Sequence, residues 1–142
     1  MAETKQRIPE TVAEMMCSEV VTAEPTTTLY QAIGLMVRNG IRHLPVVEEG
    51  KVVAVISDRN VRMMISEGQD PEERRRYLST TMVMAHASHP VTTIGPGEPP
   101  QDAARIFVES RIGCLPVVDD ADKLIGIVTQ TDLLKWIAAM VD

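Results

Sequence analysis

The residues best suited to chemistry in this sequence are TQTD at positions 129–132, a corner between two apolar segments. The β-branched run Leu124–Val128 predicts a buried strand, and the apolar spacing of Leu133–Val141 predicts a helix. Thr129 and Asp132 have the S/T-x-x-D/E spacing that caps a helix start. A hydroxyl, a carboxylate and free helix N–H groups also suit a sugar diol and a phosphate. Capping and ligand binding are therefore alternative interpretations of this corner.

The chain contains the same layout twice. Val20–Val47 aligns without a gap to Val91–Val118, and ten of the 28 paired positions are identical. Average composition would give about two identities by chance. With one residue inserted, Ala54–Asn60 aligns to Gly126–Asp132, which carries the corner. A duplicated unit that packs as a pseudo-dimer explains this better than a solenoid, for which three or more repeats are expected.

Apolar patterning and turn residues predict the elements of each copy. The first copy is expected to contain helix Pro9–Met16, a strand at 20–22, helix Leu29–Asn39 closed by Gly40, strands Ile41–Val47 and Lys51–Ser57, and a helix ending near Gly68. The second is expected to contain strand Val91–Ile94, helix Pro100–Ser110, strands Ile112–Val118 and Lys123–Thr129, and helix Thr131–Val141. A linking helix should begin at Asp70-Pro71. Each copy is therefore β-α-β-β-α, and about 50 residues are marginal alone.

These motifs resemble those of the cystathionine-β-synthase (CBS) domain. They are LPVV before a short acidic turn, GIVTxxD after it, and PVTTI ahead of a helix. Two copies in tandem resemble a stand-alone CBS pair, or Bateman module, over about residues 10–141. The resemblance implies an α/β (α+β) fold of two repeats packed as a pseudo-two-fold pair, with two equivalent clefts between them. The expected segments are a first repeat at 10–68, a linker at 69–89 and a second repeat at 90–142.

The resemblance also implies a ligand. CBS domains usually bind adenine compounds such as AMP, ADP or ATP, and sometimes S-adenosylmethionine or a dinucleotide. Asp132 would hold the ribose hydroxyls, and Thr129 would meet ribose or phosphate. The remaining second-repeat residues implied for the base and the corner are Thr92, Thr93, Ile94, Ile112, Gly113, Cys114, Pro116 and Thr131.

The first repeat departs from the family pattern at Asn60, where the family usually has Asp. An amide still bonds a hydroxyl, but without charge-assisted strength. Arg59 is well placed at a helix start to meet a phosphate, so this site is expected to be weaker, altered or empty. Arg42 and His43 lie beside the base pocket or, alternatively, face solvent at a strand edge. The implied first-repeat residues are Thr22, Arg42, His43, Pro45, Ser57, Arg59 and Asn60.

Composition excludes several functions. A net charge of −6 argues against nonspecific nucleic-acid binding, and 3% aromatic residues leave few stacking platforms. The chain has no signal-peptide pattern and no apolar run of membrane-spanning length, which predicts a cytoplasmic protein. Cys17 and Cys114 share no ligand spacing with the histidines, so no metal site is expected. Cys114 reads as a small buried hydrophobic residue.

The chain shows no pattern typical of an enzyme, such as G-x-S-x-G, a P-loop or H-E-x-x-H. We therefore expect a regulatory module that binds an adenine nucleotide as a regulatory ligand, with no obligatory cofactor. Its output would go to an unidentified protein partner in trans. Apolar residues in excess of one packing stripe on Leu133–Val141 predict a two-fold homodimer, with Trp136 near the interface. The alternatives are a ligand-free dimerisation module, or a sensor of S-adenosylmethionine, a dinucleotide or Mg²⁺.

Overall fold

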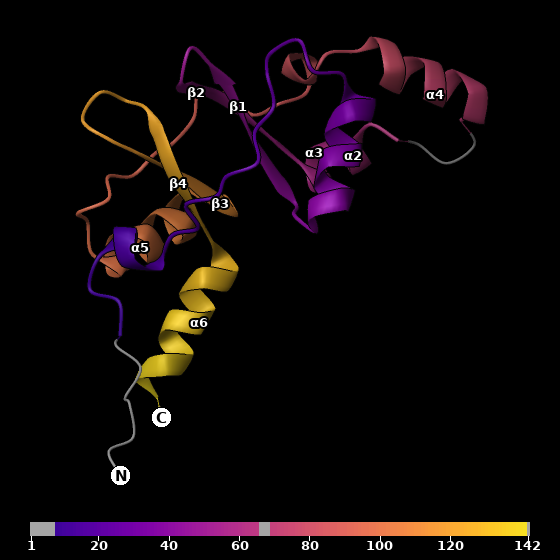
Figure 1. Cartoon of the computed structure of the whole chain (residues 1–142). Helices are drawn as coiled ribbons and strands as arrows, with labels where there is room; N and C mark the ends of the chain where they lie inside the picture. Colours follow the sequence, from indigo (N-terminus) through magenta and orange to yellow (C-terminus); the bar gives the residue numbers. More distant parts are fainter. Residues whose placement is uncertain (1–7, 66–68, 142) are drawn as a thin grey trace. The chain divides into compact units, whose positions relative to one another are not determined.

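A computed structural model describes residues 8–65 and 69–141 of the chain (Figure 1). In chain order the elements are α1 (Val12–Met15), α2 (Leu29–Asn39), β1 (His43–Glu48), β2 (Lys51–Ser57), α3 (Asp58–Met63), α4 (Pro71–Thr80), the 3₁₀ turn η1 (Val83–Ala85), α5 (Pro100–Ser110), β3 (Cys114–Val118), β4 (Leu124–Thr129) and α6 (Gln130–Met140). This is the mixed helix-and-strand fold expected from the sequence.

The described chain forms two compact units. One unit holds Val21–Val91, and the other holds the described residues up to Val20 together with those from Thr92 onward. The segments 10–68, 69–89 and 90–142 follow the sequence repeats and stay a prediction, and the boundary at 68 lies outside the described residues. Packing groups the chain differently from the repeats, because α1 belongs to the unit of α5, β3, β4 and α6.

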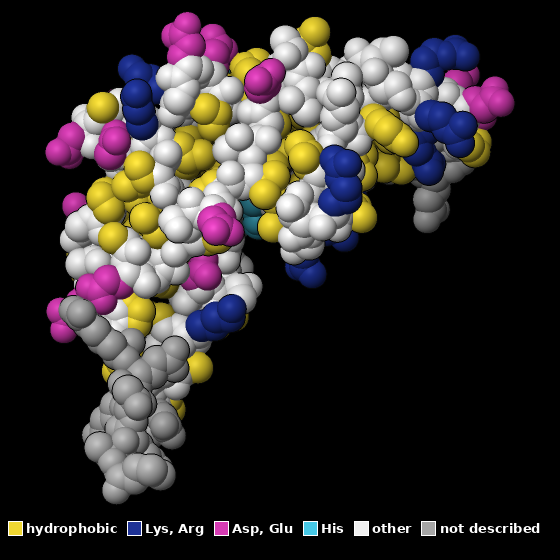
Figure 2. All heavy atoms as spheres, viewed as in Figure 1, with side chains coloured by type: hydrophobic (Ala, Val, Ile, Leu, Met, Phe, Trp, Pro, Cys, Tyr) yellow, Lys and Arg dark blue, Asp and Glu magenta, His cyan; other side chains and the backbone are white. Residues whose placement is uncertain are grey.

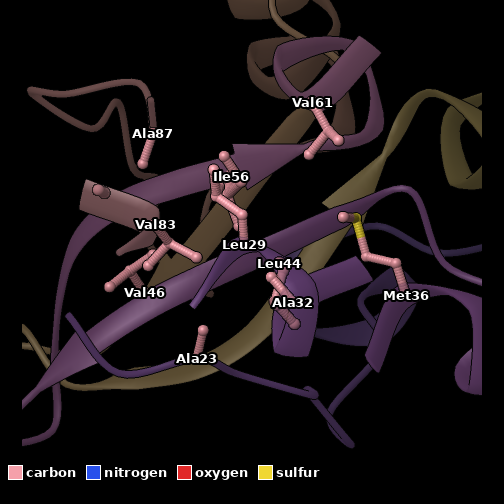
Figure 3. Close-up of a cluster of buried hydrophobic side chains, with 11 residues drawn as sticks. Ala23, Leu29, Ala32, Met36, Leu44, Val46, Ile56, Val61, Val83 and Ala87 are labelled. Carbon is pink, nitrogen blue, oxygen red and sulfur yellow. The ribbon is translucent and has the colours of Figure 1, made fainter. Parts of the chain in front are cut away.

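In the unit Val21–Val91, β1 and β2 form an antiparallel hairpin whose register begins with His43 opposite Ser57. Its turn needs left-handed backbone at Glu49 and Gly50, where φ is 54° and 82°. Figure 3 shows the buried side chains that gather from the hairpin, α2 and η1. The core residues are Ala23, Leu29, Ala32, Met36, Leu44, Val46, Ala54, Ile56, Val61, Val83 and Ala87.

Helix α2 forms at the predicted residues because both of its ends are capped. Thr28 Oγ1 accepts a hydrogen bond from Gln31 N–H at 3.2 Å, and Gln31 Oε1 accepts one from Thr28 N–H at 3.0 Å. Gly40 closes the helix with φ at 62°, a conformation that glycine adopts without a Cβ clash.

Helix α4, which has no buried residue, is capped by Asp70, and Figure 2 shows lysine and arginine side chains gathering over it.

The second hairpin repeats the first. Strands β3 and β4 pair antiparallel, with Cys114 opposite Thr129 and a register shift between Val117 and Val118. The β1–β2 hairpin has its register shift at the equivalent place, between Val46 and Val47. The core of this unit consists of Val12, Ile94, Ala103, Phe107, Leu115, Val117, Val128 and Leu133.

Each unit is completed by a leading segment that precedes, in the sequence, the first long helix of the other unit. Residues 11–17 precede α2 but pack in the unit of α5 and α6, whereas residues 82–88 precede α5 but pack in the unit Val21–Val91. Val12 is fully buried, and its N–H donates to Glu98 O at 2.8 Å. The equivalent Val83 is also fully buried, and its N–H donates to Thr27 O at 2.8 Å. Bridges from Cys17 to Ile127 and from Ser88 to Val55 extend the hairpins in the same way. The leading segments are therefore built into the two hydrophobic cores.

Some predicted element boundaries are wrong. The strands expected at 20–22 and Val91–Ile94 reduce to single parallel bridges, Ala23 to Val46 and Ile94 to Val117, because turns follow within two residues. Strand β1 begins at His43 rather than Ile41, because Ile41 N–H donates to Met36 O at 3.0 Å and so closes α2. Helix α3 ends at Met63, well before position 68.

Candidate ligand-binding site

The second-repeat corner is a capped helix start. Asp132, at the third position of α6, accepts hydrogen bonds on Oδ2 from Thr129 N–H at 2.8 Å and from Thr129 Oγ1 at 3.2 Å. The Asp132 carboxylate has no other hydrogen-bond partner among residues 8–65 and 69–141, so Oδ1 has none there. The capping interpretation is correct, yet it uses only one carboxylate oxygen. The second oxygen is a charged acceptor at a helix N-terminus that a ligand can reach, since Asp132 is half-buried.

The first-repeat corner has the same design with a different chemical outcome. Asn60 Oδ1 accepts from Ser57 N–H at 2.9 Å and from Ser57 Oγ at 2.7 Å, while Asn60 N–H donates to Ser57 Oγ at 3.1 Å. The amide oxygen is therefore taken by the cap. What Asn60 has left for a ligand is its Nδ2 amide, which donates hydrogen bonds. The first corner thus offers a donor where the second offers a charged acceptor.

Strand pairing brings the predicted base-pocket residues to the second corner. Cys114 lies opposite Thr129, and Gln130 Nε2 donates to Ile112 O at 3.4 Å across the same end of the hairpin. Burial, aided by the negative charge of Asp132, raises the pKa of the Cys114 thiol to about 12. The thiol therefore stays protonated at neutral pH and packs as a hydrophobic group, as the sequence predicts.

The other second-repeat residues predicted for the ligand site do not all lie at the second corner. Ile94 N–H donates to Pro116 O at 3.1 Å, and this bond ties the 92–94 segment to β3. Thr93 and Ile94 also line a hollow of about 410 Å³ beside α5, together with Glu98 and Asp102. A hydrogen bond to the Asp102 side chain, with the charge of Asp102, raises the pKa of Glu98. Glu109 and Arg105 line the same hollow, which therefore carries charges of both signs. Neither Thr129 nor Asp132 lines it, and the exposed Thr131 has no bond among the described residues that ties it to the corner.

In the first repeat, the predicted residues gather at the end of the β1–β2 hairpin. His43 is paired with Ser57, and Asp58 N–H donates to Arg42 O at 2.8 Å. Arg59 is exposed at the start of α3. Pro45 is buried, and its carbonyl accepts from Ala23 N–H at 2.9 Å, which places the neighbouring Thr22 next to β1.

Two contributors to these corners were missed by sequence reasoning. Gln130 joins the corner to the strand entry, but its side chain carries no signal in a T-x-x-D motif. Asp58, the first residue of α3, forms an ion pair with Arg62 at 3.1 Å. The D-x-x-x-R spacing is visible in the sequence and could have shown this pair.

The pKa of His43 is lowered by burial and by the charge of Arg42, against the opposing charge of Asp58. The ordinary pKa of histidine, which applies in the unfolded chain, is 6.5. Between pH 6.5 and the lowered pKa of the folded state, His43 is therefore protonated in the unfolded chain and neutral in the folded one. We expect the free energy of unfolding to fall as pH drops from 6.5 through the lowered folded pKa. Denaturant unfolding at pH values above and below 6.5 should show that His43→Gln weakens this dependence. A matching change in the control His89→Gln, an exposed histidine, would contradict this prediction.

Within the described ranges, no helix is long and apolar enough to cross a membrane. Nor do three or more His, Cys, Asp or Glu residues of that part of the chain gather as a metal site would require.

The repeats match the model of the CBS domain at residues 12–67 and again at 83–139. The chain therefore belongs to the CBS domain family, as a tandem pair. Among curated proteins it is 31% identical over 133 residues to the uncharacterized protein MJ1225 of Methanocaldococcus jannaschii. That match covers 91% of this chain but 48% of the relative, so the chain spans about half of that protein.

Some of the similar proteins match this chain over nearly their whole length. The CBS domain-containing protein DDB_G0289609 of Dictyostelium discoideum is 30% identical over 135 residues, which is 92% of this chain and 93% of that protein. The crystal structure of CBSX2 from Arabidopsis thaliana in complex with AMP superposes with a TM-score of 0.78. The two chains are 26% identical, and the match covers 94% of this chain and 99% of CBSX2.

The CBS domain pair of MJ0100, solved with 5′-methylthioadenosine and S-adenosyl-L-methionine, superposes with a TM-score of 0.80. Its sequence is 23% identical, with 93% of this chain and 99% of that chain covered. At this identity the likeness shows the fold alone.

Proposed function

We propose that this chain is a regulatory module that binds an adenine nucleotide at its repeat corners and reports occupancy to a separate protein. The observation that carries the proposal is Asp132, whose Oδ2 closes the helix cap while Oδ1 has no partner among the described residues. A carboxylate oxygen next to free helix N–H groups suits a ribose diol followed by a phosphate. The AMP complex of CBSX2, a pair of nearly the same extent, supports an adenine nucleotide as the ligand.

The two corners should then divide the ligand chemistry between them. At the second corner, Asp132 accepts hydrogen bonds from ribose hydroxyls. At the first, the Asn60 amide donor and the exposed Arg59 favour the phosphate end of a nucleotide. Ribose binding should therefore be stronger at the second corner. We also propose that the protein partner is a separate chain and that this protein is located in the cytoplasm.

A thermal-shift screen tests the function directly. AMP, ADP, ATP, S-adenosylmethionine, 5′-methylthioadenosine, NAD and Mg²⁺ are compared at equal ionic strength. A ligand present at 100 times its dissociation constant should stabilise the folded chain by about 2.7 kcal/mol. An adenine nucleotide should give the largest shift. If none of these compounds changes the melting temperature, the ligand-free dimerisation module becomes the better interpretation.

The dimerisation alternative has support of its own on α6, where Leu134, Ile137 and Met140 are 65%, 47% and 53% exposed. Such an apolar face is typical of a protein interface. Trp136 instead packs on the core of its own unit, and its indole N–H donates to Pro9 O at 3.0 Å. Since ligand binding and dimerisation use different surfaces, we propose both for this chain.

Asn60→Asp tests the proposed difference between the corners. An aspartate keeps the bond from Ser57 N–H but exchanges the amide donor for a charged acceptor, as at Asp132. We expect stability to change little and ribose affinity at the first corner to increase, measured by calorimetry with AMP and with adenosine. Equal affinities of the two corners in the parent chain would contradict the prediction.

A further inference from the structure

Residues 9–17, which include the leading segment of their unit, contact both elements that flank the second corner, and we call them the strap. Cys17 N–H donates to Ile127 O at 2.9 Å, and Ile127 N–H donates to Cys17 O at 2.9 Å. This bridge lies two residues before β4 ends and α6 begins. Near the other end of the strap, Pro9 O accepts the hydrogen bond of the Trp136 indole on α6. The strap therefore joins the strand that enters the corner to the helix that leaves it.

The strap packs on β4 at a glycine. A Cβ at position 126 would lie 2.8 Å from Met16 Cγ and closer still to Met16 Sδ, so the Met16 side chain lies directly against the Gly126 backbone. By the alignment of the repeats, the equivalent residues of the other unit are Ala87 on its leading segment and Ala54 on β2. One unit thus has a long side chain and a glycine where the other has two alanines. Gly126 provides the space that Met16 needs.

Few side chains hold the strap in place. Val12 is the single buried residue among residues 9–17, and α1, the helical part of the strap, is four residues long. The backbone of α1 is attached by two hydrogen bonds, from Val12 N–H to Glu98 O at 2.8 Å and from Ala13 N–H to Pro96 O at 2.9 Å. Segments with few buried side chains open at a lower free energy than the core to which they are attached. We therefore expect the strap to detach more readily than the β3–β4 hairpin unfolds.

We infer that docking of the strap and ligand binding at the second corner are coupled, so that the strap is the part of the chain that reports the ligand. A docked strap restrains β4 and α6 on the two sides of Thr129 and Asp132. A ligand that binds the restrained corner better shifts the strap toward its docked state. By linkage, docking raises the affinity for that ligand by the same factor. This inference rests on the proposed ligand site at Asp132 and adds the regulation of that site.

Hydrogen exchange of the Cys17 and Ile127 amides measures how often the strap detaches, because each amide donates across the bridge. In the parent chain, saturating AMP should slow the exchange of both amides by about fivefold or more, the lower end of typical couplings between sites. In Asp132→Asn, which is expected to lose affinity for AMP, the same concentration of AMP should give no such slowing.

Gly126→Ala tests the coupling from the side of the strap. The backbone φ of Gly126 lies outside the left-handed region, so alanine fits the strand, but the new methyl group displaces Met16. Both bridge amides should exchange faster, and the fluorescence of Trp136 should change as its bond to Pro9 is lost. The apparent dissociation constant for AMP should rise by the factor by which the docked fraction falls, about tenfold if a tenth of the chains stay docked.

Three further variants isolate the effect of the strap. Met16→Ala combined with Gly126→Ala recreates the alanine pair of the other unit, and should restore docking and AMP affinity to near the parent values. Gly97→Ala adds the same methyl group in the same unit, where nothing lies within 4 Å, and should behave like the parent. Cys17→Pro removes the N–H that donates to Ile127 O, so it should detach the strap without a substitution in β4.

The outcomes separate the coupling from the ligand site. Detachment and weaker AMP binding in Gly126→Ala and Cys17→Pro, with recovery in the double variant, support the inference. Variants that detach the strap yet bind AMP as tightly as the parent overturn the coupling and leave the ligand site intact. A strap that stays docked in both variants also overturns the coupling, since a segment that cannot be released cannot report a ligand. A parent that binds no adenine nucleotide overturns the proposed function and the coupling together.

Discussion

Replacing Asp132 with alanine should weaken binding of AMP by about 1.5–3 kcal/mol, the range for a hydrogen bond to a charged group. It should also cost about 1 kcal/mol of stability, because Thr129 N–H loses the acceptor that caps α6. Calorimetry with AMP measures the first effect, and denaturant unfolding without ligand measures the second.

Asp132→Asn separates the two roles of this side chain. An asparagine retains one oxygen for the Thr129 cap and replaces the uncommitted oxygen with an amide donor. Stability should therefore stay near that of the parent, while affinity for AMP falls. A variant with unchanged affinity and lowered stability would assign Asp132 to the helix cap alone.

Val12→Asp should destabilise the unit that contains α5, β3, β4 and α6, although Val12 belongs to the first repeat in the sequence. The Val12 side chain is fully buried, so the substitution places an unpaired carboxylate in the core, at a cost of about 3–5 kcal/mol. Detachment of the leading segment relieves that cost but breaks its hydrogen bonds to Glu98 O and to Ile127. Either way, the stability of this unit falls.

Trp136 provides a local readout, because it is the single tryptophan of the chain and donates to Pro9 O in the same unit. Its fluorescence should change at lower denaturant in Val12→Asp than in the parent. Hydrogen exchange of the β1–β2 amides should change much less, since that hairpin belongs to the other unit. Ala13→Asp, an exposed neighbour on α1, is the matched control. Equal effects of the two substitutions would contradict the role given to Val12.

Local signals in the sequence predicted several elements to the residue. Helix α2 ends where Gly40 follows it, α5 begins at Pro100, and β2 ends at Ser57, which caps the next helix. The two corners were found for the same reason, because S/T-x-x-D/N is a local motif. The CBS family and the tandem repeat followed from the order and spacing of such motifs.

Features that depend on distant contacts could not be predicted in this way. Residues 20–22 are of types that are common in strands, but the pairing observed at this place is a single parallel bridge from the next residue, Ala23, to Val46 of β1. Nothing near Val12 in the sequence indicates that its side chain is buried against a hairpin more than a hundred residues away. At the corners, the motif predicted which residues form the helix cap, but it did not predict which of their atoms take part in it. Which oxygen of Asp132 closes the cap is decided by its side-chain geometry.

The leading segments also bear on the order in which the chain folds during its synthesis. The unit Val21–Val91 is continuous in sequence, so all of its contacts are available once residue 91 has been made. Residues 11–17 must wait for β4, and pairing Cys17 with Ile127 closes a loop of more than a hundred residues. Contacts of such long sequence separation form slowly. We therefore expect residues 11–17, which are synthesised before either hairpin, to be among the last segments to dock and among the first that proteases cleave in nascent chains.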